Sequence, residues 1–284
     1  SKKIQVAEIM KVKNIVNHPI KNFGNRVRAF LQVQQGCDHR CTFCIIPYAR
    51  GGNRSLPIDS LVQQARDMVT AGFQEIVITG VDLCSYGEDL VGKPKLGSAL
   101  SELLEEVAGI KRLRLSSLDP ANLDRDLFKL LAADKRFMPY IHLSIQALDD
   151  MILKRMRRRH SVKDVVKIVK KFRDVRPGIA LGADLIAGFP TESDEMFENT
   201  LSAVKKLGIP FLHVFPYSER PGTPATKMPQ IKVEKRKKRG SELRKVGESL
   251  RDFFLENQLG HISQVLIEKG NIGRNEHAIL VELD

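Results

Sequence analysis

The sequence predicts an α/β fold in which one parallel sheet forms an open, three-quarter barrel. Short apolar stretches typical of buried strands alternate with helical stretches six times between residues 28 and 260. Such alternation implies parallel strands with right-handed crossovers. Six strand–helix units are fewer than the eight of a closed barrel, which favours the open form. Polar or turn-forming residues follow each expected strand, where folds of this kind place their chemistry.

The expected elements follow from apolar spacing and from helix-breaking residues. The first strand, residues 28–34, leads directly into a cysteine-rich loop, and Gly72 ends the first helix. The other strands are expected at 75–79, 112–116, 140–145, 179–186 and 211–215, and the helices at 60–71, 98–107, 123–132, 150–156, 162–174 and 193–207.

The chain divides into four predicted parts. Residues 1–27 are expected to be a connecting segment, because turn-forming residues interrupt them twice. Residues 28–230 form the barrel core, and residues 231–260 a basic helix whose apolar face is Leu243, Val246, Leu250, Phe253 and Phe254. Residues 261–284 hold two expected strands, 264–268 and 278–281, and are too short for an independent β-barrel.

Three of the four cysteines lie on the loop after the first strand. Cys37, Cys41 and Cys44 have the spacing C-x3-C-x2-C. Three thiolates can hold three irons of a [4Fe–4S] cluster and leave the fourth iron open to another ligand. A zinc site that adds His39 remains an alternative, although structural zinc usually takes its ligands from two separated pairs. Disulfides fit poorly, and Cys84 is expected to be a buried apolar filler.

The charge of the chain favours an anionic partner. Lys and Arg number 46 against 34 Asp and Glu, which gives a net charge of +12. Much of the positive charge lies in two runs, residues 154–160 and 232–239, and clusters of this kind are typical of phosphate contact with RNA. No apolar run reaches the roughly 18 residues of a membrane span. Unpaired cysteine spacing is typical of a reducing compartment, so we expect a cytoplasmic protein.

With Phe43 before the last cysteine, the loop resembles that of the radical S-adenosylmethionine (SAM) superfamily. The wider pattern is similar to the methylthiotransferases within that superfamily. The matching segments are Gln35–Gly51, Ile78–Asp82, His142 to Gln146, Leu153–Arg158 and Asp184–Pro190. Within this family, His213–Ala225 most resembles the branch that acts on N6-threonylcarbamoyladenosine (t6A) of tRNA.

The resemblance implies a site and a reaction. Cys37, Cys41 and Cys44 would bind the [4Fe–4S] cluster, and SAM would occupy the open iron. The expected SAM-binding walls are Phe43, Gly80, Ser116, Gln146 and Ile186, and no catalytic side chain is assigned. The family adds a methylthio group to C2 of t6A beside the anticodon. Its partners would be the tRNA anticodon stem-loop and an electron donor such as flavodoxin or ferredoxin.

The chain also departs from the family pattern. Family members carry an N-terminal domain with three more cysteines for a second [4Fe–4S] cluster, and a C-terminal β-barrel that binds RNA. Residues 1–27 resemble the linker after the first of these domains, and residues 261–284 the start of the second. A second cluster is therefore expected only in the full-length protein. Thr191-Glu192-Ser193 and Gln146-Ala147-Leu148 also differ from the usual residues at their positions.

Three other functions remain open at the level of the sequence. Two keep the chemistry and change the target, to isopentenyladenosine of tRNA or to a side chain of a ribosomal protein. The third is a zinc-bearing RNA-binding module without enzyme activity.

Overall fold

The computed structural model describes residues 8–13, 15 and 27–283. The expected connecting segment, residues 1–27, therefore lies largely outside the described residues. Within it, Ile9–Lys11 form a single 3-10 turn, η1. The main-chain carbonyl of Val12 accepts a hydrogen bond from Nη1 of Arg54 at 3.3 Å, so this turn lies beside the segment that follows the cysteine loop.

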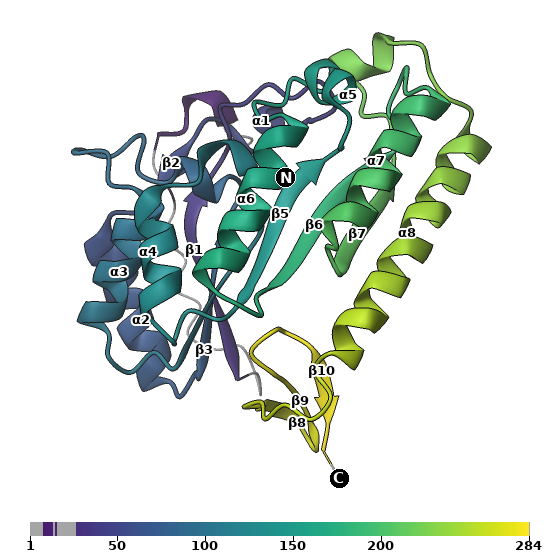
Figure 1. The fold of residues 1–284 in the computed structure, drawn as a ribbon. Helices are drawn as coiled ribbons and strands as arrows, with labels where there is room; N and C mark the ends of the chain where they lie inside the picture. Colours follow the sequence, from purple (N-terminus) through teal and green to yellow (C-terminus); the bar gives the residue numbers. More distant parts are fainter. Residues whose placement is uncertain (1–7, 14, 16–26, 284) are drawn as a thin grey trace, which may run out of the picture.

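Six parallel strands form an open barrel and follow one another in space in chain order (Figure 1). Two isolated parallel bridges, Leu113 to Phe137 and Leu118 to Leu143, join the two halves of the sheet. Within the described residues the first and last strands do not pair, so the predicted open barrel is confirmed. The strands are β1 Arg28–Gln35, β3 Glu75–Gly80, β4 Arg112–Leu115, β5 Tyr140–Gln146, β6 Ala180–Ala187 and β7 Phe211–Pro216.

Helices cover the outer face of this barrel, and side-chain caps define where several of them begin. Ser161 and Asp164 form a reciprocal capping box at the start of α6. Asp124, Asp149 and Ser193 cap α4, α5 and α7. The helices are α2 Ile58–Thr70, α3 Leu96–Glu106, α4 Arg125–Ala133, α5 Asp150–Arg155, α6 Val162–Val175, α7 Asp194–Leu207 and α8 Val233–Glu256.

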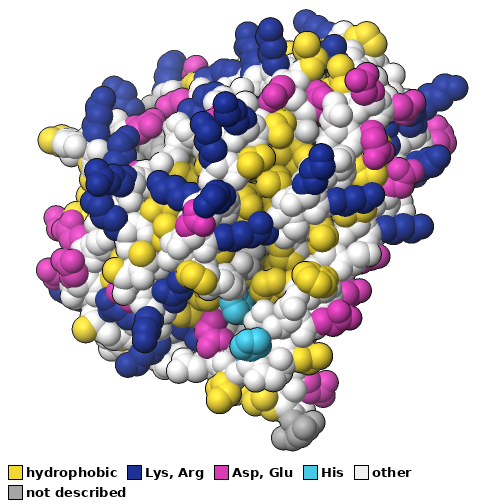
Figure 2. All heavy atoms as spheres, viewed as in Figure 1, with side chains coloured by type: hydrophobic (Ala, Val, Ile, Leu, Met, Phe, Trp, Pro, Cys, Tyr) yellow, Lys and Arg dark blue, Asp and Glu magenta, His cyan; other side chains and the backbone are white. Residues whose placement is uncertain are grey.

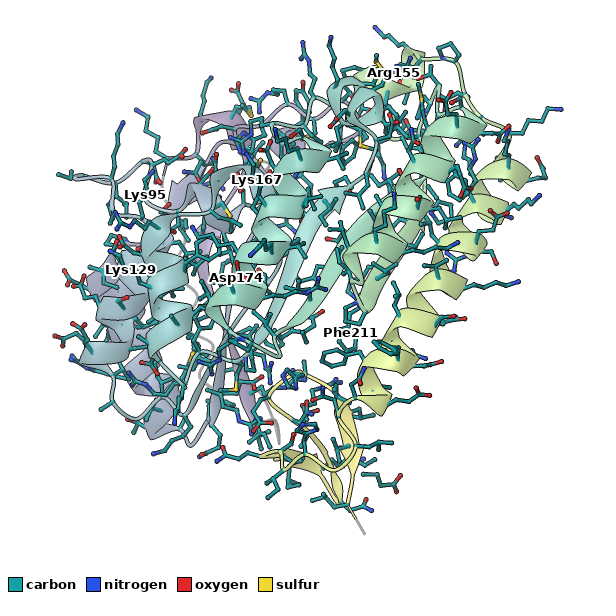
Figure 3. All side chains as sticks on the ribbon, in the orientation of Figure 1. Lys95, Lys129, Arg155, Lys167, Asp174 and Phe211 are labelled. Atoms are coloured by element: carbon teal, nitrogen blue, oxygen red, sulfur yellow. The ribbon has the colours of Figure 1, made fainter. Side chains whose placement is uncertain are left out.

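The long helix α8 packs along β7, where its small residues let the backbones approach. At Gly247 an added Cβ would lie 3.1 Å from the side chain of Leu212. Near the end of α8, Phe254 makes an edge contact with Phe211, at 5.6 Å between ring centroids, and Figure 3 shows Phe211 beside this part of α8. Phe253 is 65% exposed, so its expected place on the apolar face is wrong. The residues of α8 that pack inward are those at helical spacing from Leu243, and Phe253 lies outside that spacing.

A small antiparallel sheet lies at the lower end of the barrel, below the starts of its strands (Figure 1). It consists of β8 Leu266–Lys269, β9 Ile272–Arg274 and β10 Leu280–Glu282; β9 was not expected. Arg112 donates hydrogen bonds to the carbonyls of Gln264 and Arg274, at 2.7 and 3.0 Å. Two buried arginines of β4 thus bind the small sheet, since Arg114 also donates to the carbonyls of residues 275 and 276.

Two short elements after the cysteine loop were also not expected from the sequence. They are α1 Ile46–Arg50 and β2 Arg54–Ser55, which pairs antiparallel with the end of β1. Among the described helices, none is both long enough and apolar enough to cross a membrane.

Candidate functional site

The cysteine loop leaves β1 at the upper end of the barrel and is held in place by its main chain. Gly36 has φ +71°, and a Cβ there would lie 1.8 Å from the carbonyl oxygen of Gly52. Glycine is therefore required at this turn. The amide of Cys37 donates to the carbonyl of Gly51 at 3.1 Å, which fixes the first cysteine of the loop.

Thr42 ties the same loop to the far side of the barrel. Its hydroxyl donates to the carbonyl of Arg155 at 2.8 Å, and its amide to the carbonyl of Met156 at 3.1 Å. Its own carbonyl accepts from the amide of Ala225 at 2.9 Å. Segments from opposite halves of the sheet thus meet around the three cysteines.

The three thiols of this loop are free and half-buried. Burial raises the pKa of Cys37 to about 12, and the charges of Cys41 and Cys44 add to this effect. Burial likewise raises the pKa of Cys44. These groups are therefore near enough to influence one another. A metal must displace their protons when it binds, because only the thiolate is a ligand.

The distances between possible ligand atoms distinguish a site for a metal cluster from a site for a single ion. In the described part of the chain, Cys37 shares a compact group of possible ligand atoms, all within 4.8 Å of one another, with His39 and Asp82. Cys41 and Cys44 do not belong to that group. Within the described residues, the three thiols therefore do not form one group of this size together. A four-iron cluster does not need such a group, because it presents its irons to separate thiolates.

A polar group stands behind Cys37 at the end of β3. Nε2 of His39 lies 2.9 Å from Oδ2 of Asp82, and the hydroxyl of Ser85 donates to that oxygen at 2.8 Å. Burial opposes ionisation of Asp82, but His39 and Ser85 outweigh it, so the pKa of Asp82 is lowered. A carboxylate is therefore present 3.9 Å from the sulfur of Cys37.

A buried cation stands behind the second cysteine. Nη1 of Arg158 donates to the sulfur of Cys41 at 3.7 Å, and Nη2 lies 3.0 Å from Oδ2 of Asp119. Nη2 also donates to the carbonyl of Ser144 at 2.8 Å. Only 8% of the Arg158 side chain is exposed. Arg158 was expected to contact phosphate with the rest of its basic run, and that expectation is wrong because its guanidinium points inward.

A cavity of about 340 Å³ opens beside the loop, at the upper ends of β5, β6 and β7. Gln146 has φ +71°, an uncommon conformation for a residue other than glycine and one that often marks functional sites. The cavity is lined by Phe43, Gln146, Asp184, Ile186, Phe215, Pro216, Tyr217, Ser218 and Arg220.

Three of the five expected SAM walls line this cavity, namely Phe43, Gln146 and Ile186. Gly80 does not line it, and a Cβ there would lie 2.7 Å from the side chain of Leu83, so close packing favours glycine at this position. Ser116 does not line it either. Its hydroxyl is nevertheless buried and without a hydrogen-bond partner in the described part of the chain, so it could bond a cofactor.

Two further residues serve packing. Gly188 follows β6, and a Cβ there would lie 2.7 Å from the side chain of Arg236. Cys84 is buried, and its sulfur donates to the carbonyl of Asp119 at 3.4 Å. Burial raises the pKa of Cys84, so it remains a thiol.

The basic runs divide into inward and outward residues. In the first run, Arg155 donates to the carbonyl of Thr191 at 3.0 Å, near the upper end of the molecule in Figure 3. In the second, Arg236 and Arg239 of α8 are buried. Figure 2 shows Lys and Arg spread over this face. The exposed basic residues of the two runs are Lys154, Arg157, Arg159, Lys232, Lys235, Lys237 and Lys238.

The chain is similar to known proteins, both to a family model and to individual relatives. A family model described as the Radical SAM superfamily matches residues 31–204. The chain is 49% identical over 282 residues to the threonylcarbamoyladenosine tRNA methylthiotransferase MtaB of Rickettsia prowazekii. That match covers 99% of this chain and 67% of the relative.

A second relative has the same name and comes from Aquifex aeolicus. It is 36% identical, over 95% of this chain and 65% of its own length. Relatives from Bacillus subtilis and Thermotoga maritima are covered over 49% and 57% of their lengths. The chain thus spans from about half to two thirds of the curated relatives it matches.

Solved structures share the fold. The methyltransferase TsrM of Kitasatospora setae, with cobalamin and a [4Fe-4S] cluster bound, matches with a TM-score of 0.55 at 19% identity. The match covers 69% of this chain and 38% of that one. Coproporphyrinogen III oxidase of Escherichia coli matches with a TM-score of 0.54 at 16% identity, over 86% of this chain and 55% of that one.

Proposed function

Because this chain belongs to the radical SAM superfamily and, within it, to the tRNA methylthiotransferases, we propose that it is the catalytic core of a t6A-modifying enzyme. The reaction would add a methylthio group to C2 of t6A beside the anticodon. The observation that carries this proposal is the position of three free thiols on one rigid loop, next to a cavity walled by Phe43, Gln146 and Ile186.

The family uses a [4Fe–4S] cluster and SAM. The donor set fits them, because Cys37, Cys41 and Cys44 are three free thiols on one loop and a buried hydroxyl, that of Ser116, lacks a partner among the described residues. When bound, the two groups together supply one-electron radical chemistry. The chain itself positions them: Gly36 and Thr42 hold the loop, while Asp82 and Arg158 set the charge around its sulfurs.

We further propose that the substrate is a tRNA anticodon stem-loop. Hairpin loops expose unstacked bases, which an enzyme that modifies a base carbon must reach. The exposed cations of both basic runs could contact the phosphates. A one-electron donor such as flavodoxin or ferredoxin would supply the reducing equivalent. The RNA substrate and the oxygen-sensitive cluster favour the cytoplasm.

Other targets have less support. Relatives named tRNA-2-methylthio-N(6)-dimethylallyladenosine synthase are similar at 34–36% identity, below the 49% of the Rickettsia relative. Nothing in the described site favours a ribosomal protein side chain. A zinc-bearing RNA-binding module has less support, because the chain belongs to the radical SAM superfamily.

Two measurements test the proposal. Residues 1–284, with the cluster assembled and reduced without air, should cleave SAM to 5′-deoxyadenosine and methionine. They should yield no methylthiolated tRNA, because Cys84 alone cannot hold a second cluster. Methylthiolated product from this chain alone would contradict that expectation.

The second measurement uses cells that lack the full-length gene. Mass spectrometry of their tRNA nucleosides should show unmodified t6A in place of its methylthio derivative. A full-length Cys84→Ala variant should restore the modification, and a Cys41→Ala variant should not. If methylthiolation of isopentenyladenosine is lost instead, the assigned nucleoside is wrong.

A further inference from the structure

A second polar cluster lies on one face of the barrel sheet, and Asp184 within it also lines the cavity beside the cysteine loop. The cluster consists of His142 on β5, Asp184 on β6 and His213 on β7, three neighbouring strands. Asp184 and His213 are direct partners in the sheet, and the partner of His142 is Gly182, two residues before Asp184 and on the same face of β6. Barrel interiors are usually packed with apolar side chains. A polar layer there calls for an explanation.

Both imidazoles of the cluster are directed at the same carboxylate oxygen. Nε2 of His142 lies 3.1 Å from Oδ1 of Asp184, and Nδ1 of His213 lies 3.3 Å from that same atom. The other oxygen, Oδ2, accepts only a long contact of 3.4 Å from the hydroxyl of Ser144 among its hydrogen bonds in the described residues. The two ring nitrogens and Oδ1 are thus close enough together to bind one cation placed between them.

The spacing suits a borderline transition metal. The possible ligand atoms of the three residues all lie within 4.8 Å of one another. Ligands of zinc bind at about 2.0–2.1 Å, which places tetrahedral neighbours about 3.3 Å apart. The separations of Oδ1 of Asp184 from Nε2 of His142 and from Nδ1 of His213 agree with this value. The third can close by rotation of His213, whose side chain is 61% exposed.

The surroundings orient one of these rings. The hydroxyl of Tyr140 lies 3.0 Å from Nδ1 of His142, which directs the other ring nitrogen, Nε2, at Asp184. Gly182 makes room for this pair, because a Cβ there would lie 2.3 Å from Nδ1 of His142 and 2.6 Å from the Tyr140 hydroxyl. A second hydrogen-bonding partner of this kind is typical of metal-binding histidines.

We propose that His142, Asp184 and His213 bind a divalent transition cation of the zinc class. Three protein ligands leave a coordination position open, as in catalytic rather than structural sites. Asp184 also lines the cavity of Phe43, Gln146 and Ile186, so the open position would face the space that receives substrate. An oxygen or nitrogen atom of a substrate could bind there.

The experiment titrates zinc into residues 1–284 with the [4Fe–4S] cluster already assembled, so that the three thiols are occupied. Calorimetry gives affinity and stoichiometry, and zinc X-ray absorption identifies the ligand atoms. We expect one zinc ion with nitrogen and oxygen ligands. Asp184→Asn and His213→Ala should each weaken binding at least about tenfold, and Tyr140→Phe roughly tenfold.

The variants are chosen to fold. His213 is exposed, and Asp184→Asn keeps the shape of the side chain. His261→Ala, at an exposed histidine outside the cluster, is the matched control and should bind zinc as the unmodified chain does. Absence of binding, sulfur among the zinc ligands, or equal affinity in all variants would each overturn the proposal.

Discussion

The guanidinium of Arg158 donates a hydrogen bond to the sulfur of Cys41, 3.7 Å away, across 117 positions of sequence. The same group is paired with Asp119 at 3.0 Å. Hydrogen bonds to ligand sulfurs are one of the means by which proteins set the potential of an iron–sulfur cluster. If Cys41 binds the cluster as proposed, Arg158 would place positive charge beside it without being a ligand.

Arg158→Lys should make the cluster harder to reduce. Lysine keeps the positive charge, but its ammonium cannot reproduce the planar set of donors that reaches Cys41, Asp119 and the carbonyl of Ser144. The midpoint potential, followed by electron paramagnetic resonance during a redox titration, should move to a more negative value. Arg158→Ala should instead destabilise the fold, by at most about 3–5 kcal/mol, because the buried carboxylate of Asp119 loses its nearest cation and keeps only the longer contact with Arg159.

Arg159→Lys is the control for this experiment. Arg159 contacts the same carboxylate, at 3.5 Å, but its side chain is 37% exposed. Its replacement should leave the potential unchanged. Equal potentials in Arg158→Lys and the unmodified chain would show that the contact with Cys41 has no electronic effect.

The cysteines should separate into two classes. Alanine at Cys37, Cys41 or Cys44 should abolish the cluster absorbance and most of the bound iron, because each thiolate holds one iron. Cys84→Ala should leave iron content unchanged, since its sulfur is buried and bonded to a carbonyl. Loss of about half the iron in Cys84→Ala would contradict the assignment.

Charge reversal should identify the RNA-binding surface. Arg157, Lys237 and Lys238 are exposed members of the two basic runs. Glutamate at all three should weaken tRNA binding and flatten its salt dependence, by about 0.7–0.9 in the log–log slope for each phosphate that is no longer neutralised. Binding is measured at several salt concentrations. Reversal of three exposed lysines elsewhere, Lys129, Lys167 and Lys205, provides the matched control. Equal slopes in both triple variants would mean that the basic runs are ordinary solvated surface.

His160 should make stability depend on pH in the acid range. Burial, with the charge of Arg158, lowers the pKa of His160 below its usual 6.5. The unfolded chain therefore takes up a proton near pH 6.5 that the folded chain resists. This contribution to stability is fully present above pH 6.5 and is lost as pH falls through the folded-state pKa, at up to about 1.4 kcal/mol per pH unit.

Urea unfolding between pH 5 and 8 measures this effect. His160→Asn should give a shallower decline below pH 6.5 than the unmodified chain. His261→Ala, at an exposed histidine, should not change the slope. Parallel curves for His160→Asn and the unmodified chain would mean that His160 does not resist protonation.

Local patterns in the sequence were enough to predict the barrel and its cysteine loop. Strand–helix alternation depends on residues a few positions apart, and so does the C-x3-C-x2-C spacing of Cys37, Cys41 and Cys44. Ends of parallel strands meet at one edge of the sheet, and the family resemblance implied that Phe43, Gln146 and Ile186 wall one site there; all three line one cavity. None of these inferences required knowledge of which side chains touch.

Which side chains contact one another was decided by the tertiary structure. Arg158 and Arg157 are neighbours in one basic run, yet one points to Cys41 and the other to solvent, because only the fold brings Asp119 and the carbonyl of Ser144 to one side of that loop. Likewise, the side chains of Leu83 and Arg236 lie close to Gly80 and Gly188, which the residues around those glycines in the sequence do not reveal.

The polar layer of His142, Asp184 and His213 shows most clearly why the sequence alone was insufficient. These residues lie 42 and 29 positions apart, and each looks ordinary on its own strand. Their ligand atoms meet because His213 is opposite Asp184 in the sheet, while His142 is opposite Gly182, two residues before Asp184 on the same face of β6. Such registers arise from side-chain packing and main-chain pairing between strands, which the spacing within any single strand does not encode.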